Sequence, residues 1–173
     1  HRAIGGDRRA EIHRIPMQVG PWGIAATPDG RLIVVANGGS QRERLAGTVI
    51  SLIDVDRASA GDPDAEVARL LVGTDDPREQ THPFIPSVTP DGREVIVPNY
   101  RANNVSIVNL ELARVGDPAA EVARIPLVRE DGRPARPKGS AITADGRYAV
   151  ISGGAATRPF SQEVGHVYVI DLR

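Results

Sequence analysis

The chain alternates between short apolar runs rich in Val and Ile and polar turns rich in Gly, Pro, Asn and Asp. Three of these runs are RLIVVAN at 31–37, REVIVPN at 93–99 and RYAVISG at 147–153. Several are apolar at consecutive positions, which is typical of strands that are covered on both faces. No segment of helical length carries apolar residues at a 3.6-residue spacing, so the pattern predicts an all-β protein.

A ten-residue pattern occurs three times and organises these strands. It reads PWGIAATPDG at 21–30, PFIPSVTPDG at 83–92 and PKGSAITADG at 137–146. Each copy opens with a proline and ends with Asp-Gly, which favours a tight hairpin because glycine adopts a positive φ without steric cost. A unit of about 50 residues that repeats in series is typical of propeller blades.

Each repeat contains up to four predicted strands. The first strand lies before Asp-Gly and the second directly after it. The third and fourth strands are predicted at 48–56 and 66–72 in the first repeat and at 104–112 and 121–128 in the second. The third repeat has a third strand at 166–173. The segment 11–19 (EIHRIPMQV) matches the fourth strand of a repeat. Residues 65–71 also suit a helical turn, but their match to 121–128, which contains Pro126, favours a strand.

This order predicts a β-propeller segment of about three four-stranded antiparallel blades. We expect one partial propeller domain over 1–173, with an outer strand of a preceding blade at 1–20, blades at 21–72 and 83–128, and three strands of a further blade at 137–173. Because propeller rings contain about four to eight blades, three cannot close a ring. Further blades must come from a longer chain, in a ring of about six to eight, or from a second copy.

The repeat resembles that of the YVTN family of β-propeller proteins. The resemblance rests on Pro-x-Gly-x-Ala-x-x-Pro-Asp-Gly at 21–30, on Val-x-x-Ile-Asp at 167–171, and on the tetrapeptides VVAN (34–37), IVPN (96–99) and, altered, VISG (150–153). It covers residues 11–173. It implies a propeller of the surface-layer and lactonase-like kind, in a periplasmic, extracellular or cell-surface setting.

Composition excludes several kinds of chemistry. The chain has no cysteine, which excludes disulfides, thiolate nucleophiles and Cys-ligated metals. Its 21 basic and 22 acidic residues give no basic field for nucleic acid, and no apolar run reaches the length of a membrane span. The histidines have no metal-binding spacing, and no phosphate-binding motif occurs. We therefore expect no metal, no cofactor, no nucleic acid and no membrane span.

The candidate ligand contacts lie on the rim formed by the loops that enter the first strand and leave the second strand of each blade. Candidates near the first strands are Trp22, His82, Phe84 and Lys138. Candidates after the second strands are Asn37, Asn99, Tyr100, Arg101 and Asn103. The loops 38–47 and 153–165 add Arg42, Arg44, Arg158 and Phe160.

These polar and aromatic residues also have structural interpretations. Asn37 and Asn99 suit turns, because asparagine tolerates left-handed geometry. Trp22 suits packing between blades. Two sets share repeat positions and suit structural hydrogen bonds, namely the hairpin residues Asp29, Asp91 and Asp145, and the later residues Asp54, Asn109 and Asp171.

The sequence favours a binding module over an enzyme. We expect a rigid propeller scaffold that presents its rim loops to a protein, a glycan or another surface ligand. The resemblance leaves two alternatives. One is a segment of a lactonase-like hydrolase, with His82 as acid or base and Arg101 as the anion-binding group. The other is a docking domain beside haem or quinone in a periplasmic redox assembly. Convergent polar groups in a deep channel pocket would indicate an enzyme.

Overall fold

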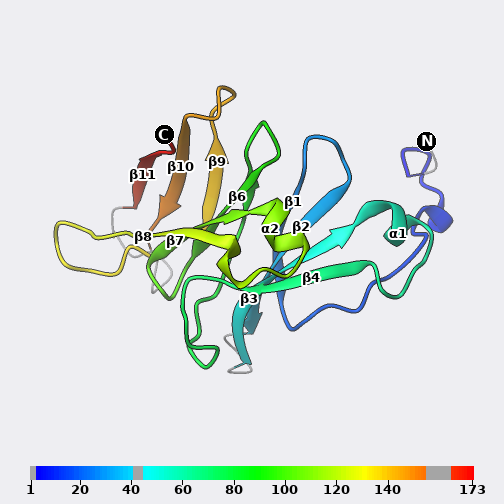
Figure 1. Cartoon of the computed structure of the whole chain (residues 1–173), viewed down its shortest axis with the longest axis horizontal. Coiled ribbons are helices and arrows are strands. Elements are labelled where there is room, and N and C mark those ends of the chain that lie inside the picture. The colour runs from blue at the N-terminus through cyan, green and yellow to red at the C-terminus, as the bar shows by residue number, and fades with distance from the viewer. Residues whose placement is uncertain (1–2, 41–44, 155–164) are drawn as a thin grey trace.

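The computed structural model describes residues 3–40, 45–154 and 165–173, which form a row of three antiparallel sheets (Figure 1). The first sheet contains β1 (Pro21–Ala26), β2 (Leu32–Ser40), β3 (Leu45–Asp54) and β4 (Glu66–Leu71). The second contains β5 (Ser87–Val88), β6 (Glu94–Asn99), β7 (Asn104–Asn109) and β8 (Glu121–Pro126). The third contains β9 (Gly139–Ile142), β10 (Tyr148–Gly153) and β11 (His166–Asp171). Strands are adjacent in chain order within each sheet, which is the meander of a propeller blade.

The Asp-Gly hairpins have the same hydrogen bonds in all three sheets. The Thr27 hydroxyl donates to the Asp29 carboxylate at 2.6 Å and accepts from the Leu32 N–H at 3.0 Å. The Thr89 and Thr143 hydroxyls make the equivalent bonds. The Thr27 hydroxyl, followed by a backbone N–H, lowers the pKa of Asp29 below its ordinary value. The hairpin interpretation of these aspartates is confirmed, and the three turns lie at the top of Figure 1.

The third strands end earlier than predicted because a short helix follows each of the first two. These helices are α1 (Val55–Ser59) and α2 (Leu110–Arg114). The Asp54 and Asn109 side chains accept the backbone N–H three residues on, each at 3.0 Å, and so cap the helices. The expected structural hydrogen bonds of this repeat position are therefore confirmed, and Asp171 accepts from the Arg173 N–H at 3.2 Å. Two 3-10 helices, η1 (Arg8–Ala10) and η2 (Pro118–Ala120), complete the described elements.

The segment 11–19 does not form the predicted strand. In the described structure it joins no sheet, because β3 and β7 already pair with β4 and β8, and the edge strand β11 lies at the opposite end of the row. Ile15 and Met17 instead pack on the outer face of the first sheet. Glu11 still pairs with Arg14, as Glu does with Arg in the matching strands β4 and β8.

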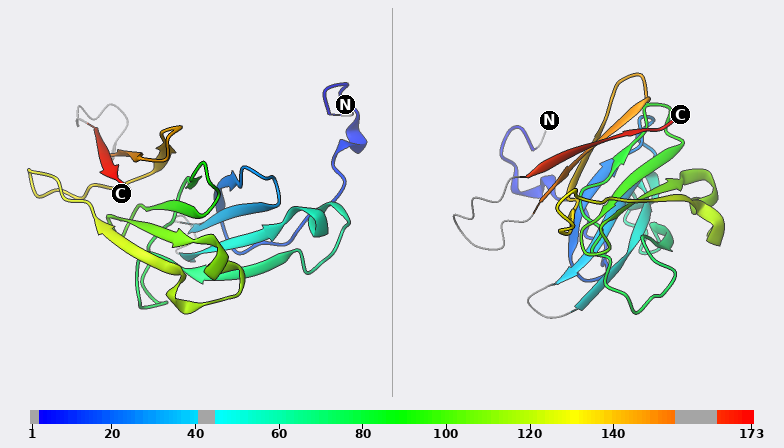
Figure 2. Two further views of the ribbon diagram at one scale, coloured as in Figure 1. Left: turned by 45° about the horizontal axis from the view of Figure 1, so that its top comes forward. Right: turned by 90° about the vertical axis from the view of Figure 1, so that its left-hand side faces the viewer.

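The apolar core lies between adjacent sheets. Val95 and Val97 of β6 pack toward the first sheet, and Ile96 between them packs toward the third. Burial on both faces explains the consecutive apolar residues of this strand. The ends of the described chain lie at opposite ends of the row (Figure 2). Among the described residues, no helix has both the length and the apolar character needed to cross a membrane.

Candidate functional site

The residue directly before the first proline of each repeat has an unusual backbone conformation. Gly20 precedes the proline of the first repeat and has a φ of 69°, a conformation that glycine adopts freely. His82 and Arg136 occupy the same position in the next two repeats, with φ of 50° and 48°. Backbone bonds hold this geometry, since His82 donates its N–H to the Gly47 carbonyl at 2.8 Å. The repeat therefore holds the backbone at this position in a left-handed conformation, even where the residue has a side chain.

Three aromatic rings form a row at the end of the sheets opposite the Asp-Gly turns. The ring centroids of Trp22 and Phe84 lie 5.2 Å apart, and those of Phe84 and Tyr100 lie 5.3 Å apart. The Trp22 indole N–H donates to the Gly39 carbonyl at 2.9 Å, and the residue remains 56% exposed. A Cβ on Gly38 would lie 2.5 Å from the Trp22 ring, so this glycine makes room for the indole.

Two cations extend the row on the third sheet's side. The Arg136 guanidinium lies 5.7 Å and the Lys138 ammonium 5.6 Å from the centre of the Tyr100 ring. Arg136 also donates to the Tyr100 hydroxyl oxygen at 3.3 Å. Within the part of the chain that the structure describes, neither cation pairs with a carboxylate. We call Trp22, Phe84, Tyr100, Arg136 and Lys138 the aromatic–cationic row.

The row unites residues from all three sheets. Trp22 is the second residue of β1, Phe84 precedes β5, Tyr100 follows β6, and Lys138 precedes β9. Four of its five members were candidates from the sequence. Arg136 was missed, although its place before Pro137 matches that of His82 before Pro83.

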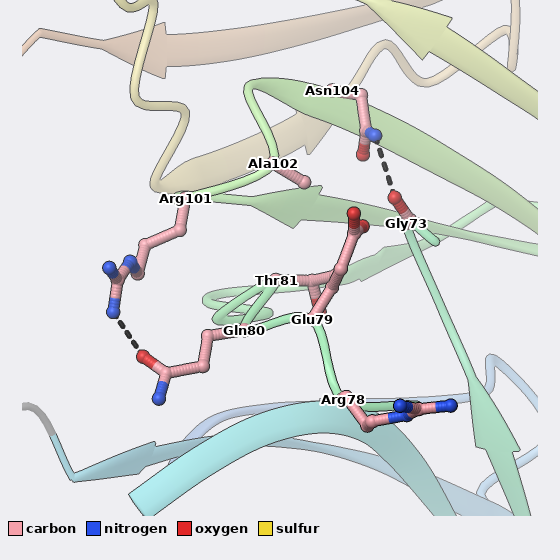
Figure 3. Close-up of a pocket in the computed structure, with 8 residues that line it drawn as sticks. All are labelled: Gly73, Arg78, Glu79, Gln80, Thr81, Arg101, Ala102 and Asn104. Carbon is pink, nitrogen blue, oxygen red and sulfur yellow. Dashed lines mark hydrogen bonds between the residues drawn. The ribbon is translucent and has the colours of Figure 1, made fainter. Parts of the chain in front are cut away.

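A polar pocket of about 650 Å³ adjoins the row, since Arg101 in its wall follows Tyr100 (Figure 3). It lies between the connector after β4 and the turn between β6 and β7, and its lining is Gly73, Arg78, Glu79, Gln80, Thr81, Arg101, Ala102 and Asn104. Arg101 donates to the Gln80 side-chain oxygen, and the Thr74 hydroxyl donates to Glu79. Figure 3 shows the Arg101 and Arg78 side chains pointing in different directions, so the charged groups do not converge on one point.

His82 lies in the interior. Its side chain is 1% exposed, and neither ring nitrogen has a hydrogen-bond partner among the described residues. Burial lowers the pKa of His82 below its ordinary value, and the positive charge of Arg101 lowers it further. Both effects favour the neutral form of the ring. The acid or base role of His82, with Arg101 as anion binder, stays a prediction.

Asn37 and Asn99 lie inside the sheets, although the sequence suggested rim contacts or left-handed turns. Both are fully buried. Asn37 donates to the Ser51 hydroxyl at 2.8 Å, and Asn99 donates to the Ser106 hydroxyl at 2.7 Å. They differ from the expectation because both still belong to the second strands: β2 continues past Asn37, and Asn99 is the last residue of β6. Asn103, with a φ of 55°, is the asparagine that adopts the left-handed turn conformation.

Some candidate rim residues lie outside the described residues. They are Arg42, Arg44, Arg158 and Phe160. The candidate site described here therefore consists of the aromatic–cationic row and the polar pocket beside it.

No protein-family model matches the chain, and no curated protein matches it in sequence. Solved structures do match its fold. Kuenenia stuttgartiensis hydrazine synthase matches with a TM-score of 0.62 and 21% identity, over 94% of this chain and 36% of that one. The dihydro-heme d1 dehydrogenase NirN matches with a TM-score of 0.55 and 22% identity, over 84% of this chain and 26% of that one. A streptogramin B lyase matches with a TM-score of 0.53 and 16% identity, over 92% of this chain and 43% of that one.

These matched structures are β-propeller proteins, and they confirm the predicted fold class. The chain spans less than half of the length of each of them. At this level of sequence identity, the likeness establishes the fold.

Proposed function

We propose that the chain is a scaffold segment of a β-propeller that binds a ligand on the rim carrying the aromatic–cationic row. The observation that carries the proposal is the row of rings spaced 5.2 and 5.3 Å apart, with Trp22 more than half exposed. Exposed apolar surface that is contiguous and rimmed by polar groups is typical of a binding site. Aromatic residues with one polar group are enriched at such sites.

The row is a preorganised surface. The Trp22 indole is held by the Gly39 carbonyl, and the Phe84 N–H donates to the Pro98 carbonyl at 2.9 Å. Side chains fixed before binding lose little conformational entropy when a ligand arrives. In the pocket beside the row, Arg78 and Arg101 point in different directions, whereas the enzyme alternative calls for charged groups that converge. Both features favour recognition over catalysis.

The proposal includes membership of the YVTN family and an exported setting. The tetrapeptides at 34–37 and 96–99 support the first, and the resemblance to exported propellers supports the second. Its other partners are further blades, from the rest of a longer chain or from a second copy. The outer faces of the first and third sheets, which expose Ile24 and Val169, support this.

A redox assembly is a second candidate function. Two matched structures are named as a hydrazine synthase and a dihydro-heme d1 dehydrogenase, and this favours it. The chain would then supply a docking wall. Purification of the native assembly separates the two functions, because a haem or quinone partner would co-purify and absorb visible light only in the redox case.

Trp22 allows a direct test, because it is the single tryptophan of the chain and reports on the site by its fluorescence. The probes are xylohexaose, hexagalacturonate, and one acidic and one basic peptide without tryptophan. We expect at least one probe to change the fluorescence saturably, and Phe84→Ala to weaken its binding about tenfold, or about 1.4 kcal/mol.

Tyr148→Ala is the matched control for Phe84→Ala. Tyr148 also carries a cation on its ring, Arg147 at 4.8 Å, but it follows the Asp-Gly turn of the third sheet at the other end. Its variant should bind as the unaltered chain does. The proposal is overturned if no probe binds, or if Phe84→Ala binds as tightly as the unaltered chain.

A further inference from the structure

We infer that the ligand of the aromatic–cationic row is an acidic glycan, with a sugar ring on the exposed Trp22 and a carboxylate beside Arg136 and Lys138. This inference rests on the proposed function and names the ligand class of the same rim. Four features of the row carry it: two cations without a carboxylate partner among the described residues, the exposed Trp22, the length of the row across the sheets, and the paired backbone groups beside it.

The cations of the row are available to an anion. Arg136 and Lys138 are half-buried, and each lies within 6 Å of the Tyr100 ring centre without a carboxylate partner in the described ranges. The partly buried arginines of the outer strands differ, because Arg124 pairs with Glu121 at 2.5 Å. Half-buried cations of this kind bind a carboxylate by charge-assisted hydrogen bonds. The ligand is therefore anionic at this end of the row.

The other end of the row is apolar and uncharged. The strip of rings starts at Trp22, which is 56% exposed, and continues to Phe84 and Tyr100, which are half-buried, with neighbouring centroids 5.2 and 5.3 Å apart. Aromatic faces bind flat surfaces made of C–H groups. A sugar ring presents such a surface, and a chain of sugars presents several in succession. Because the strip begins on the first sheet and ends at the third, an extended ligand fits it better than a single small ring.

Backbone groups of Ile85 and Lys138, beside the row, are already paired. The Ile85 N–H donates to the Lys138 carbonyl and the Lys138 N–H donates to the Ser152 carbonyl, both at 2.9 Å. Peptides that bind as an added strand need free N–H and C=O groups. The row therefore recognises its ligand through side chains, which favours a glycan over an acidic peptide.

The experiment compares ligands and variants by Trp22 fluorescence and by calorimetry. We expect hexagalacturonate to bind at least about tenfold more tightly than neutral xylohexaose, with an affinity that falls as salt is added, because charge pairs are screened. Galacturonate monomer should bind far more weakly than the hexamer, because it covers only part of the strip.

Three variants assign the effect to the cations. Lys138→Gln removes one charge with little change of shape, and Arg136→Gly introduces the residue that the first repeat has at this position, Gly20. Each variant should lower the affinity for hexagalacturonate about five- to tenfold and leave the affinity for xylohexaose unchanged. Arg147→Gln, at the other cation–ring pair, is the control and should have no effect. Circular dichroism checks that each variant is folded.

The outcomes separate this inference from the proposed function. Equal affinity for neutral and acidic glycans, binding of a peptide alone, or a monomer as tight as the hexamer each overturns the acidic-glycan inference and leaves the rim as a binding site. Unchanged affinity in both Lys138→Gln and Arg136→Gly also overturns it. Absence of any binding overturns the inference and the proposed function together.

Discussion

His82 and Arg136 show how the repeat constrains single residues. Both have the left-handed backbone that glycine has at the same position of the first repeat. A non-glycine residue in a sparsely populated backbone region costs of the order of 1–3 kcal/mol and persists only where its surroundings determine it. Here the surrounding backbone bonds do so, and the Tyr100 N–H donates to the His82 carbonyl at 2.9 Å. At Arg136 this conformation accompanies a cation placed against Tyr100.

The buried His82 predicts a loss of stability in mild acid. The pKa of His82 is lower in the folded chain than in the unfolded chain, because burial and the charge of Arg101 disfavour its protonated form. Its neutral form is fully populated in both states only above the ordinary histidine pKa of about 6.5. As the pH falls through that value, protons bind the unfolded state first and the free energy of unfolding decreases.

Urea unfolding at a series of pH values from 7.5 to 5 measures this effect. In the variant His82→Asn, the free energy of unfolding should depend less on pH, whether or not the variant is less stable at neutral pH. Asparagine is chosen because it tolerates a positive φ. An equally steep pH dependence in this variant would rule out His82 as the cause.

Adjacent inner strands lie close together at Gly23. A Cβ on this residue would lie 2.5 Å from both the Ile85 Cα and the Phe84 carbonyl oxygen. Gly139 has the same repeat position, but a Cβ there meets only the Ser152 hydroxyl, at 3.1 Å. The glycine of the first repeat is therefore required by packing between elements, and it positions Phe84 in the row.

Gly23→Ala should destabilise the chain by about 1–3 kcal/mol, because added volume in a packed contact forces the strands apart. It should also shift the Trp22 emission, since Phe84 packs on that ring. Gly139→Ala should change the free energy of unfolding by less than about 1 kcal/mol. Denaturant unfolding of both variants measures this difference. Equal losses in the free energy of unfolding would contradict the packing explanation.

The two outer faces of the row of sheets remain apolar. Ile12 and Ile24 are 60% and 67% exposed beside an apolar depression of about 470 Å³ on the first sheet. Val167 and Val169 are each 66% exposed on the third sheet. Sheet faces of this kind normally lie against another layer, and their exposure favours association.

We expect the chain by itself to self-associate as its concentration rises. The double variant Val167→Thr, Val169→Thr should associate less, because threonine keeps the strand propensity and removes apolar surface. Val128→Thr, at a valine 77% exposed in a connector, is the control and should behave as the unaltered chain. Sedimentation velocity over a concentration series measures this. A chain that stays monomeric throughout would contradict the prediction.

The sequence by itself determined the strands and the turns. The second strands and the Asp-Gly hairpins were predicted to within a few residues, because they depend on local patterns of apolar and turn residues. The helix after Asp54 was missed, although an N-cap residue followed by Asp56 was its local signal. The segment 11–19 kept the pattern of an outer strand, but the edge strand β11 lies at the opposite end of the row of sheets. A strand pattern alone does not provide a partner.

Only the tertiary structure decided which side chains form the site. Trp22, Phe84, Tyr100 and Lys138 were separate candidates, and their meeting depends on how three sheets pack side by side. The same packing buried Asn37, Asn99 and His82, which the repeat had also placed near the rim. Burial depends on contacts between residues far apart in the chain, whereas the hairpins depend on neighbours within a few residues. For that physical reason the blades can be predicted from the sequence and the binding row cannot.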